Sequence, residues 1–165
     1  MFCISDYYIG YFSIVKNQYI AEIEINYKPK SILGLFKISN SNDTYLYLKK
    51  VWSKHINYKE EFYLICLNRA NKVLGYSVIS VGGISGCVVD PRIIFQTALK
   101  ANASAIIIAH NHPSGNLQPS DQDIKITKNI TKAGVILQQP LLDHLIITDE
   151  GYFSFADEGI LIKEY

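Results

Sequence analysis

The feature that most constrains the fold is the stretch Ser104–Ala109, which belongs to the most apolar run in the chain. Side chains of a strand alternate between the two faces of a sheet, so a strand that is apolar at successive positions must be covered on both sides. We therefore expect this stretch to form a central strand, with helices packed on both faces of its sheet.

The surrounding patterns predict the other strands of this sheet. An aromatic and aliphatic run follows Glu60 and Glu61, and a second apolar run follows the polar turn at 68–72 as its antiparallel partner. The predicted strands besides the central one cover Phe62–Leu67, Val73–Val81 and Leu141–Thr148. The order of strands and helices indicates an α/β fold, a mixed α+β sandwich with a central mixed β-sheet flanked by helices.

Capping residues predict where the helices begin and end. Asp90 followed by Pro91 is typical of a helix start, because aspartate accepts hydrogen bonds from free amide groups and proline gives up an N–H that would lack a partner. Gly134 is predicted to end the helix that begins at Ser120, in the left-handed conformation that favours glycine. The predicted helices cover Asp43–His55, Asp90–Lys100, Ser120–Gly134 and a short segment at Ser154–Asp157.

A chain of 165 residues is long enough for one domain and an additional arm. Apolar and polar residues alternate over Tyr19–Tyr27, which predicts a strand, and Tyr11–Val15 is positioned to pair with it in a hairpin. We therefore predict an N-terminal β-strand arm over residues 1–37, followed by a domain over residues 38–165. The tyrosine-rich arm is a candidate surface for homo-oligomer formation.

Charge and cysteine content limit the classes of function. Sixteen basic and fifteen acidic residues give a net charge of +1, whereas nucleic-acid binders usually carry a much larger positive excess. Three cysteines, an odd and widely spaced set, indicate reduced core residues rather than disulfides. The N-terminus lacks the basic start of a secretory signal, and no apolar run is long enough to cross a bilayer. We expect a cytoplasmic soluble protein that does not associate with membranes.

The apolar strand leads directly into His110 and His112, two of only four histidines in the chain. In extended chain both imidazoles leave the same side of the strand, so both can reach one metal ion. A pair of this kind also occurs simply as polar loop residues. Further along, Ser120 and Asp123 have the spacing of a reciprocal helix cap, but Asp123 can equally offer an oxygen ligand. Two nitrogens and one oxygen leave one position of a tetrahedral zinc ion open, as in catalytic sites.

The residues around this site resemble a known family. His110 and His112, then seven residues, Ser120, two residues and Asp123 look like the JAMM signature of MPN-type zinc hydrolases. The string "HNHPSGNLQPSDQD", preceded by "DPRIIF" and followed by "LDHLII", is similar to the RadC family in particular. The resemblance covers about residues 38 to 161 and implies a JAMM/MPN-like fold of cytidine-deaminase-like architecture.

The resemblance also implies the site residues. One zinc ion per chain would be bound by His110, His112 and Asp123, and a glutamate upstream would act as general base. The matching position lies two residues before the phenylalanine that begins the predicted strand Phe62–Leu67. This position is Glu60. Glu61 is the alternative, because the sequence does not decide which of these two neighbours faces the histidine loop.

The activity implied is zinc-assisted hydrolysis of a peptide or isopeptide bond in a peptide or protein substrate. Zinc makes hydroxide available near neutral pH. Glu60 would move the proton to the leaving amine, and Ser120 would donate a hydrogen bond to the oxyanion. Asp143 and His144 are expected to support the structure or the metal ligands, while Gly82, Gly83 and Gly86 fit either a groove or a simple turn.

Other functions compete with this interpretation. RadC-like proteins were named for DNA repair, so a DNA-associated role is an alternative, although the first 38 residues resemble strands rather than a helical DNA-binding region. A metal-free scaffold role, known among MPN relatives, is disfavoured by the intact ligand set. A nucleoside deaminase would need a Pro-Cys-x-x-Cys motif, and a P-loop or dinucleotide fold would need glycine spacings that this chain lacks.

Overall fold

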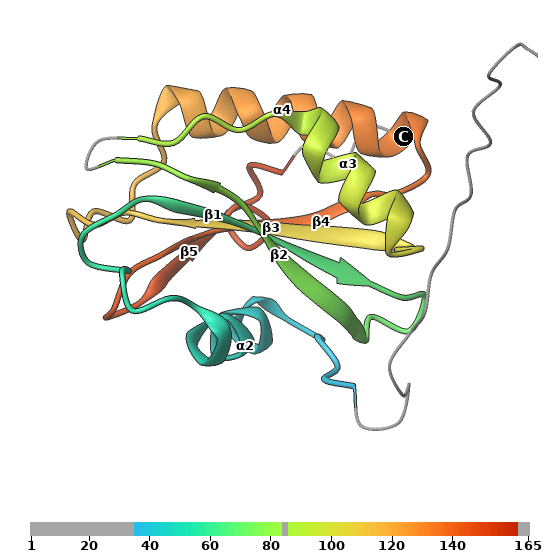
Figure 1. Cartoon of the computed structure of the whole chain (residues 1–165), viewed down its shortest axis with the longest axis horizontal. Coiled ribbons are helices and arrows are strands. Elements are labelled where there is room, and N and C mark those ends of the chain that lie inside the picture. Colours follow the sequence, from blue (N-terminus) through green and yellow to red (C-terminus); the bar gives the residue numbers. More distant parts are fainter. Residues whose placement is uncertain (1–34, 84–85, 162–165) are drawn as a thin grey trace, which may run out of the picture.

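The computed structural model describes residues 35–83 and 86–161, which form three layers (Figure 1). A five-stranded sheet with the order β2-β1-β3-β4-β5 is the middle layer. Helix α2 lies on one face of the sheet, and α3 and α4 lie on the other (Figure 1). The strands are β1 (Glu61–Leu67), β2 (Val73–Val81), β3 (Ala105–Asn111), β4 (Leu141–Ile147) and β5 (Tyr152–Ser154). The helices are α2 (Ser41–Val51), α3 (Pro91–Lys100) and α4 (Asp121–Ile136). The predicted fold class is confirmed.

Strand β3 is the central strand that the apolar run predicted. Every residue of β3 is buried. It pairs antiparallel with β1 on one side and parallel with β4 on the other, which makes the sheet mixed. The predicted antiparallel pairing of β1 with β2 is also present.

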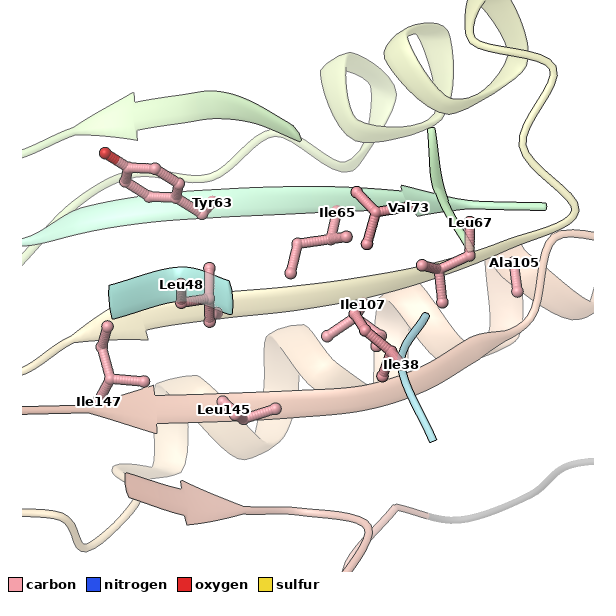
Figure 2. Close-up of a cluster of buried hydrophobic side chains, with 11 residues drawn as sticks. Ile38, Leu48, Tyr63, Ile65, Leu67, Val73, Ala105, Ile107, Leu145 and Ile147 are labelled. Atoms are coloured by element: carbon pink, nitrogen blue, oxygen red, sulfur yellow. The ribbon is translucent and has the colours of Figure 1, made fainter. Parts of the chain in front are cut away.

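Alternation along β3 divides the core into two clusters. Ala105, Ile107 and Ala109 pack in the cluster between the sheet and α2, to which α2 contributes Leu48 (Figure 2). Ile106 and Ile108 pack in the other cluster, beneath α3 and α4. Because side chains alternate, the last residues of β3 are also assigned to opposite faces.

Asn111, the last residue of β3, faces α2 and is completely buried. Its Nδ2 donates to the carbonyl oxygens of Ile56 and Lys59 at 2.6 and 2.7 Å. Its Oδ1 accepts a hydrogen bond from the backbone N–H of Glu61 at 2.7 Å. One side chain therefore ties the whole connection between α2 and β1 to the end of β3.

Helix α3 begins as predicted, with the Asp90 carboxylate accepting from the Arg92 N–H and Pro91 in the first turn. Helix α2 is capped by Asn40 rather than starting at Asp43, and it ends at Val51 instead of His55. The backbone becomes extended at Trp52, whose ring stacks on the ring of Tyr63 with 3.9 Å between centroids. This stacking on β1 explains the early end of the helix.

The predicted end of α4 at Gly134 is wrong. The helix continues to Ile136, and the left-handed conformation is taken by Gln138 with φ 55°. Gly134 instead allows a close approach, because a Cβ atom there would lie 2.6 Å from the carbonyl oxygen of Gln139. The glycine is needed for packing against the following chain and not for a turn.

The short helix predicted at Ser154–Asp157 is also wrong. Ser154 ends β5, and a turn follows. The buried Asp143 carboxylate accepts hydrogen bonds from the Ser154 hydroxyl at 2.7 Å and the Ala156 N–H at 3.0 Å. These contacts and the complete burial of Phe155 override the local helix signal.

The predicted arm over residues 1–37 lies outside the described residues, apart from residues 35–37. Of these, Lys37 forms an isolated antiparallel bridge with Lys72, just before β2. Within 35–83 and 86–161, no helix is both long enough and apolar enough to span a membrane.

Replacing Gly134 by alanine separates two opposing effects. Helix propensity alone would favour alanine by about 1 kcal/mol, whereas overpacking costs about 1–3 kcal/mol. The clashing atom belongs to the backbone and cannot rotate away, so we expect a net loss of about 1 kcal/mol or more in the free energy of unfolding, measured with urea. Gly75→Ala is the control, since nothing lies within 4 Å of its new Cβ. A more stable Gly134→Ala variant would contradict the packing argument.

Asn111→Ala tests the tie between β3 and the α2–β1 connection. The change leaves the buried Glu61 N–H and two carbonyl groups without partners, so we expect unfolding free energy to fall by about 2–4 kcal/mol. Asn68→Ala is the matched control, because its Oδ1 accepts from the exposed N–H of Ala70 and the partly buried N–H of Lys72, and neither bond is fully shielded from water. Equal losses in the two variants, in urea or thermal unfolding, would refute the proposed tie.

Candidate metal centre

Three side chains from two elements meet beyond the end of β3. His110 is the second-to-last residue of β3, His112 follows the strand, and Asp123 lies in the first turn of α4. Their ligand atoms all lie within 4.8 Å of one another. His110 Nε2 lies 3.0 Å from His112 Nε2 and 3.1 Å from Asp123 Oδ1, and His112 Nε2 lies 3.7 Å from Asp123 Oδ2. No second group of this kind occurs among the described residues.

The loop after β3 returns the chain to this point. The His112 N–H donates to the Ile147 carbonyl at 3.2 Å, so His112 stays beside β4. The Gly115 N–H donates to the His112 carbonyl at 3.0 Å, and Gly115 adopts a φ of 78° that other residues rarely take. This tight turn begins the return to the start of α4.

Asp123 serves both as a helix cap and as a member of the cluster. Its Oδ2 accepts from the Ser120 N–H at 2.7 Å and from the Ser120 hydroxyl at 2.6 Å. The Asp123 N–H donates to Ser120 Oγ at 3.2 Å, which completes the capping box. Its Oδ1 faces His110. The two interpretations of this segment are compatible, because each carboxylate oxygen has its own partner.

The donor set fits a zinc ion. His112 Nδ1 lies 2.6 Å from the carbonyl oxygen of Asn116, which only accepts, so Nδ1 of the neutral ring carries the proton and Nε2 offers a lone pair. Zinc bonds of about 2.0–2.2 Å in tetrahedral geometry separate neighbouring ligand atoms by about 3.3 Å. The distances of 3.0 Å between the two Nε2 atoms and 3.1 Å between His110 Nε2 and Asp123 Oδ1 are close to that value, and the three ligand atoms all lie within 4.8 Å of one another.

The charges of the cluster favour a cation. Burial acts to raise the pKa of Asp123, but hydrogen bonds from His110 and His112 outweigh it and hold this pKa far below its ordinary value. The hydrogen bond with Asp123 is also the main cause that raises the pKa of His112, against the effect of burial. The carboxylate thus stays charged and attracts positive charge, whether a proton or a metal ion.

The two neighbouring glutamates face opposite sides of the sheet. Glu60 lines a cavity of about 640 Å³ together with His110, His112 and Asp123. Glu61 is buried on the α2 side, where it accepts a hydrogen bond from the Ser53 hydroxyl at 2.7 Å. Only Glu60 therefore shares the cavity with the cluster.

Two of the glycines noted in the sequence hold Glu60 by backbone contacts. The Gly82 N–H donates to the Glu60 carbonyl at 2.8 Å, and the Glu60 N–H donates to the Gly83 carbonyl at 3.2 Å. Gly86 lines the cavity. Cys87, expected in the core, lines the cavity too and donates from Sγ to Glu60 Oε1 at 3.4 Å. The other cysteine with a described position, Cys66, is buried as predicted.

Asp143 and His144 point to opposite faces of β4 and have different tasks. Asp143 holds the turn after β5, and burial raises the pKa of its carboxyl to about 6. His144 is completely buried, and its Nε2 lies 2.9 Å from His110 Nδ1. His144 thus contacts a ligand of the cluster from behind.

Sequence reasoning missed Asn111 and Thr127. Asn111 stands between the two histidines, and strand alternation could have assigned it to the face opposite them. Thr127 Oγ1 lies 2.6 Å from His144 Nδ1. Its position four residues after Asp123, on the same side of the helix, was the available signal.

Comparisons with known proteins agree with this architecture. The sequence profile of the RadC-like JAB domain matches residues 38–160. A UPF0758 protein of Flavobacterium johnsoniae is 43% identical over 143 residues, which cover 86% of this chain and 62% of that protein. UPF0758 proteins of Porphyromonas gingivalis and Thermotoga maritima are 49% and 45% identical over 104 and 98 residues. These matches cover 62% and 59% of this chain, and 46% and 44% of the two relatives.

The chain therefore spans less than two thirds of the length of these relatives. Within that span the match includes the whole described sheet, the three helices and the histidine loop. By this profile and these relatives, the chain belongs to the RadC-like JAB domain family.

Proposed function

We propose that the chain is a zinc-dependent hydrolase that cleaves peptide or isopeptide bonds. The observation that carries the proposal is the convergence of His110, His112 and Asp123 on a cavity that Glu60 also lines. Three protein ligands with room for a fourth are typical of catalytic rather than structural zinc sites. Membership of a JAB-domain family adds support, because zinc binding is frequent in that family.

In this proposal His110, His112 and Asp123 hold the ion, with both histidines bound through Nε2. A bound zinc ion would lower the pKa of a coordinated water to about 7 and polarise the scissile carbonyl. Glu60 accepts a proton from the attacking water and passes it to the leaving amine. Backbone hydrogen bonds to Gly82 and Gly83 hold Glu60 in the lining of the cavity.

Ser120 is proposed to donate a hydrogen bond to the developing oxyanion. Its hydroxyl donates to Asp123 Oδ2 in the structure, at 2.6 Å, and a rotation about one side-chain bond redirects that proton into the cavity. A single donor of this kind contributes about 3–4 kcal/mol to transition-state stabilisation in other enzymes.

We further propose a peptide or protein chain as the partner and the cytoplasm as the setting. The cavity is open and mixed in polarity, with Val89 and Ile126 beside the charged groups, which suits a peptide backbone with an apolar side chain. The two cysteines with described positions are free thiols, as expected in a reducing compartment. Association through residues 1–37 stays a prediction.

The metal-ligand assignment predicts about one zinc ion per chain in protein purified without chelator. His112→Ala should remove the zinc, because only two protein ligands remain. His55→Ala is the matched control, since His55 is a half-exposed histidine that contacts Glu61 on the opposite face. Elemental analysis by mass spectrometry measures the content. Full zinc retention in His112→Ala would exclude the assignment.

The general-base assignment predicts that Glu60→Gln lowers the hydrolysis rate by about 10²–10⁴-fold while the zinc content stays unchanged. Quenched fluorescent peptide and isopeptide libraries serve as substrates. Glu61→Gln is the matched control, because the same chemical change occurs on the opposite face of the sheet. Circular dichroism verifies folding of both variants. A Glu60→Gln protein as active as the wild type would show that another group is the base.

A further inference from the structure

The second ring nitrogen of His110 leads away from the cavity into a buried chain of hydrogen bonds. His110 Nδ1 lies 2.9 Å from His144 Nε2, and His144 Nδ1 lies 2.6 Å from Thr127 Oγ1. Thr127 Oγ1 in turn donates to the backbone carbonyl oxygen of Asp123 at 2.5 Å. The side chains of His110, His144 and Thr127 are all buried. Water therefore does not substitute for any of these contacts.

The direction of each hydrogen bond follows from the far end of the chain. A carbonyl oxygen only accepts, so the single hydroxyl proton of Thr127 points to Asp123. Two oxygens 2.5 Å apart without a proton between them would repel each other. Thr127 must therefore accept from His144, which places a proton on His144 Nδ1.

The remaining bond depends on the charge of His144. Its ring is completely buried, stacks on Phe155 with 4.6 Å between centroids, and has Phe62 5.8 Å away. Among the described residues, the hydrogen-bond partners of the two ring nitrogens are His110 and Thr127, and neither is a carboxylate. An imidazolium is strongly disfavoured in such surroundings. A neutral His144 with its proton on Nδ1 has a bare Nε2, which accepts from His110 Nδ1–H.

We propose that Thr127 and His144 are positioning residues that fix His110 in the tautomer whose Nε2 lone pair faces the cavity. This inference rests on the metal-ligand part of the proposed function and does not depend on the reaction catalysed. In this inference Thr127 keeps the proton of His144 on Nδ1, and the bare Nε2 of His144 keeps the proton of His110 on Nδ1. The pair thereby determines which nitrogen of His110 is free to bind a metal ion.

The hydrogen bonds also link two of the proposed ligands. They run from His110 through His144 and Thr127 to the backbone carbonyl of Asp123, and the ligand atoms His110 Nε2 and Asp123 Oδ1 lie 3.1 Å apart. Two ligands on different elements, one on β3 and one on α4, are thereby held in register. His112 has its own support, since its Nδ1 faces the Asn116 carbonyl.

Thr127→Val tests the inference because valine keeps the shape of threonine and removes the hydroxyl. Thr127→Ser restores the hydroxyl and should rescue the effect. Thr131→Val is the matched control: Thr131 is also buried on α4 and donates to the carbonyl four residues earlier, at 2.9 Å, but it lies one turn further from the cluster.

The first readout is the zinc dissociation constant, measured by competition with a chromogenic chelator. We expect Thr127→Val to weaken zinc binding by about 10–100-fold, as changes in groups that orient metal ligands do. Thr127→Ser and Thr131→Val should keep the wild-type affinity. Unchanged affinity in Thr127→Val, or an equal loss in Thr131→Val, would overturn the inference.

The second readout is the tautomer of each ring, from long-range ¹H–¹⁵N correlation spectra of the metal-free full chain. In the wild type we expect His110, His112 and His144 each to carry a proton on Nδ1. In Thr127→Val we expect His110 to populate a form that lacks the Nδ1 proton, while His112 stays unchanged as an internal control.

The wild-type spectrum needs no variant, so it decides the matter even if Thr127→Val lowers stability. A wild-type His110 that lacks a proton on Nδ1 would overturn the inference. A protein that binds no zinc but shows the expected tautomers would refute the proposed function and support the positioning of His110. The two failures are thus distinguishable.

Discussion

The structure depends on the burial of β3 on both faces. Because every residue of this strand is covered, its side chains cannot exchange faces without placing a polar group in one of the two apolar clusters. His110 is thereby directed toward α4 and Asn111 toward α2. The core thus determines which side of the sheet carries the cluster and which side holds the α2–β1 connection.

Several contacts at the site perform two tasks at once. Asp123 caps α4 with one carboxylate oxygen and faces His110 with the other. Asn111 secures the chain that leads to Glu60 through its bond to the next residue, Glu61. The arrangement of the cluster is therefore inseparable from ordinary structural stabilisation. The two residues that orient His110, Thr127 and His144, lie on α4 and β4 rather than on loops.

Much of this was predictable from local signals, and the failures have a common physical cause. The continuous apolar run identified β3, and the capping residues identified the starts of α3 and α4. Two wrong boundaries arise where contacts with other elements decide the backbone, as with Trp52 stacked on Tyr63 and Ala156 bonded to Asp143. The faces of Glu60 and Glu61 were undetermined because two adjacent carboxylates look alike until the register of β1 against β3 is known. Thr127 was missed because its contact depends on where α4 lies over β4.

The thiol that touches Glu60 has a consequence for the chemistry of the cavity. A cysteine near a zinc site is usually a competing soft ligand and a target for oxidants. Here burial, followed by the charge of Glu60, raises the pKa of Cys87 to about 12. The sulfur therefore remains a neutral thiol at physiological pH and is a poor nucleophile. In the metal-free protein, peroxides and electrophiles should accordingly react slowly with this thiol.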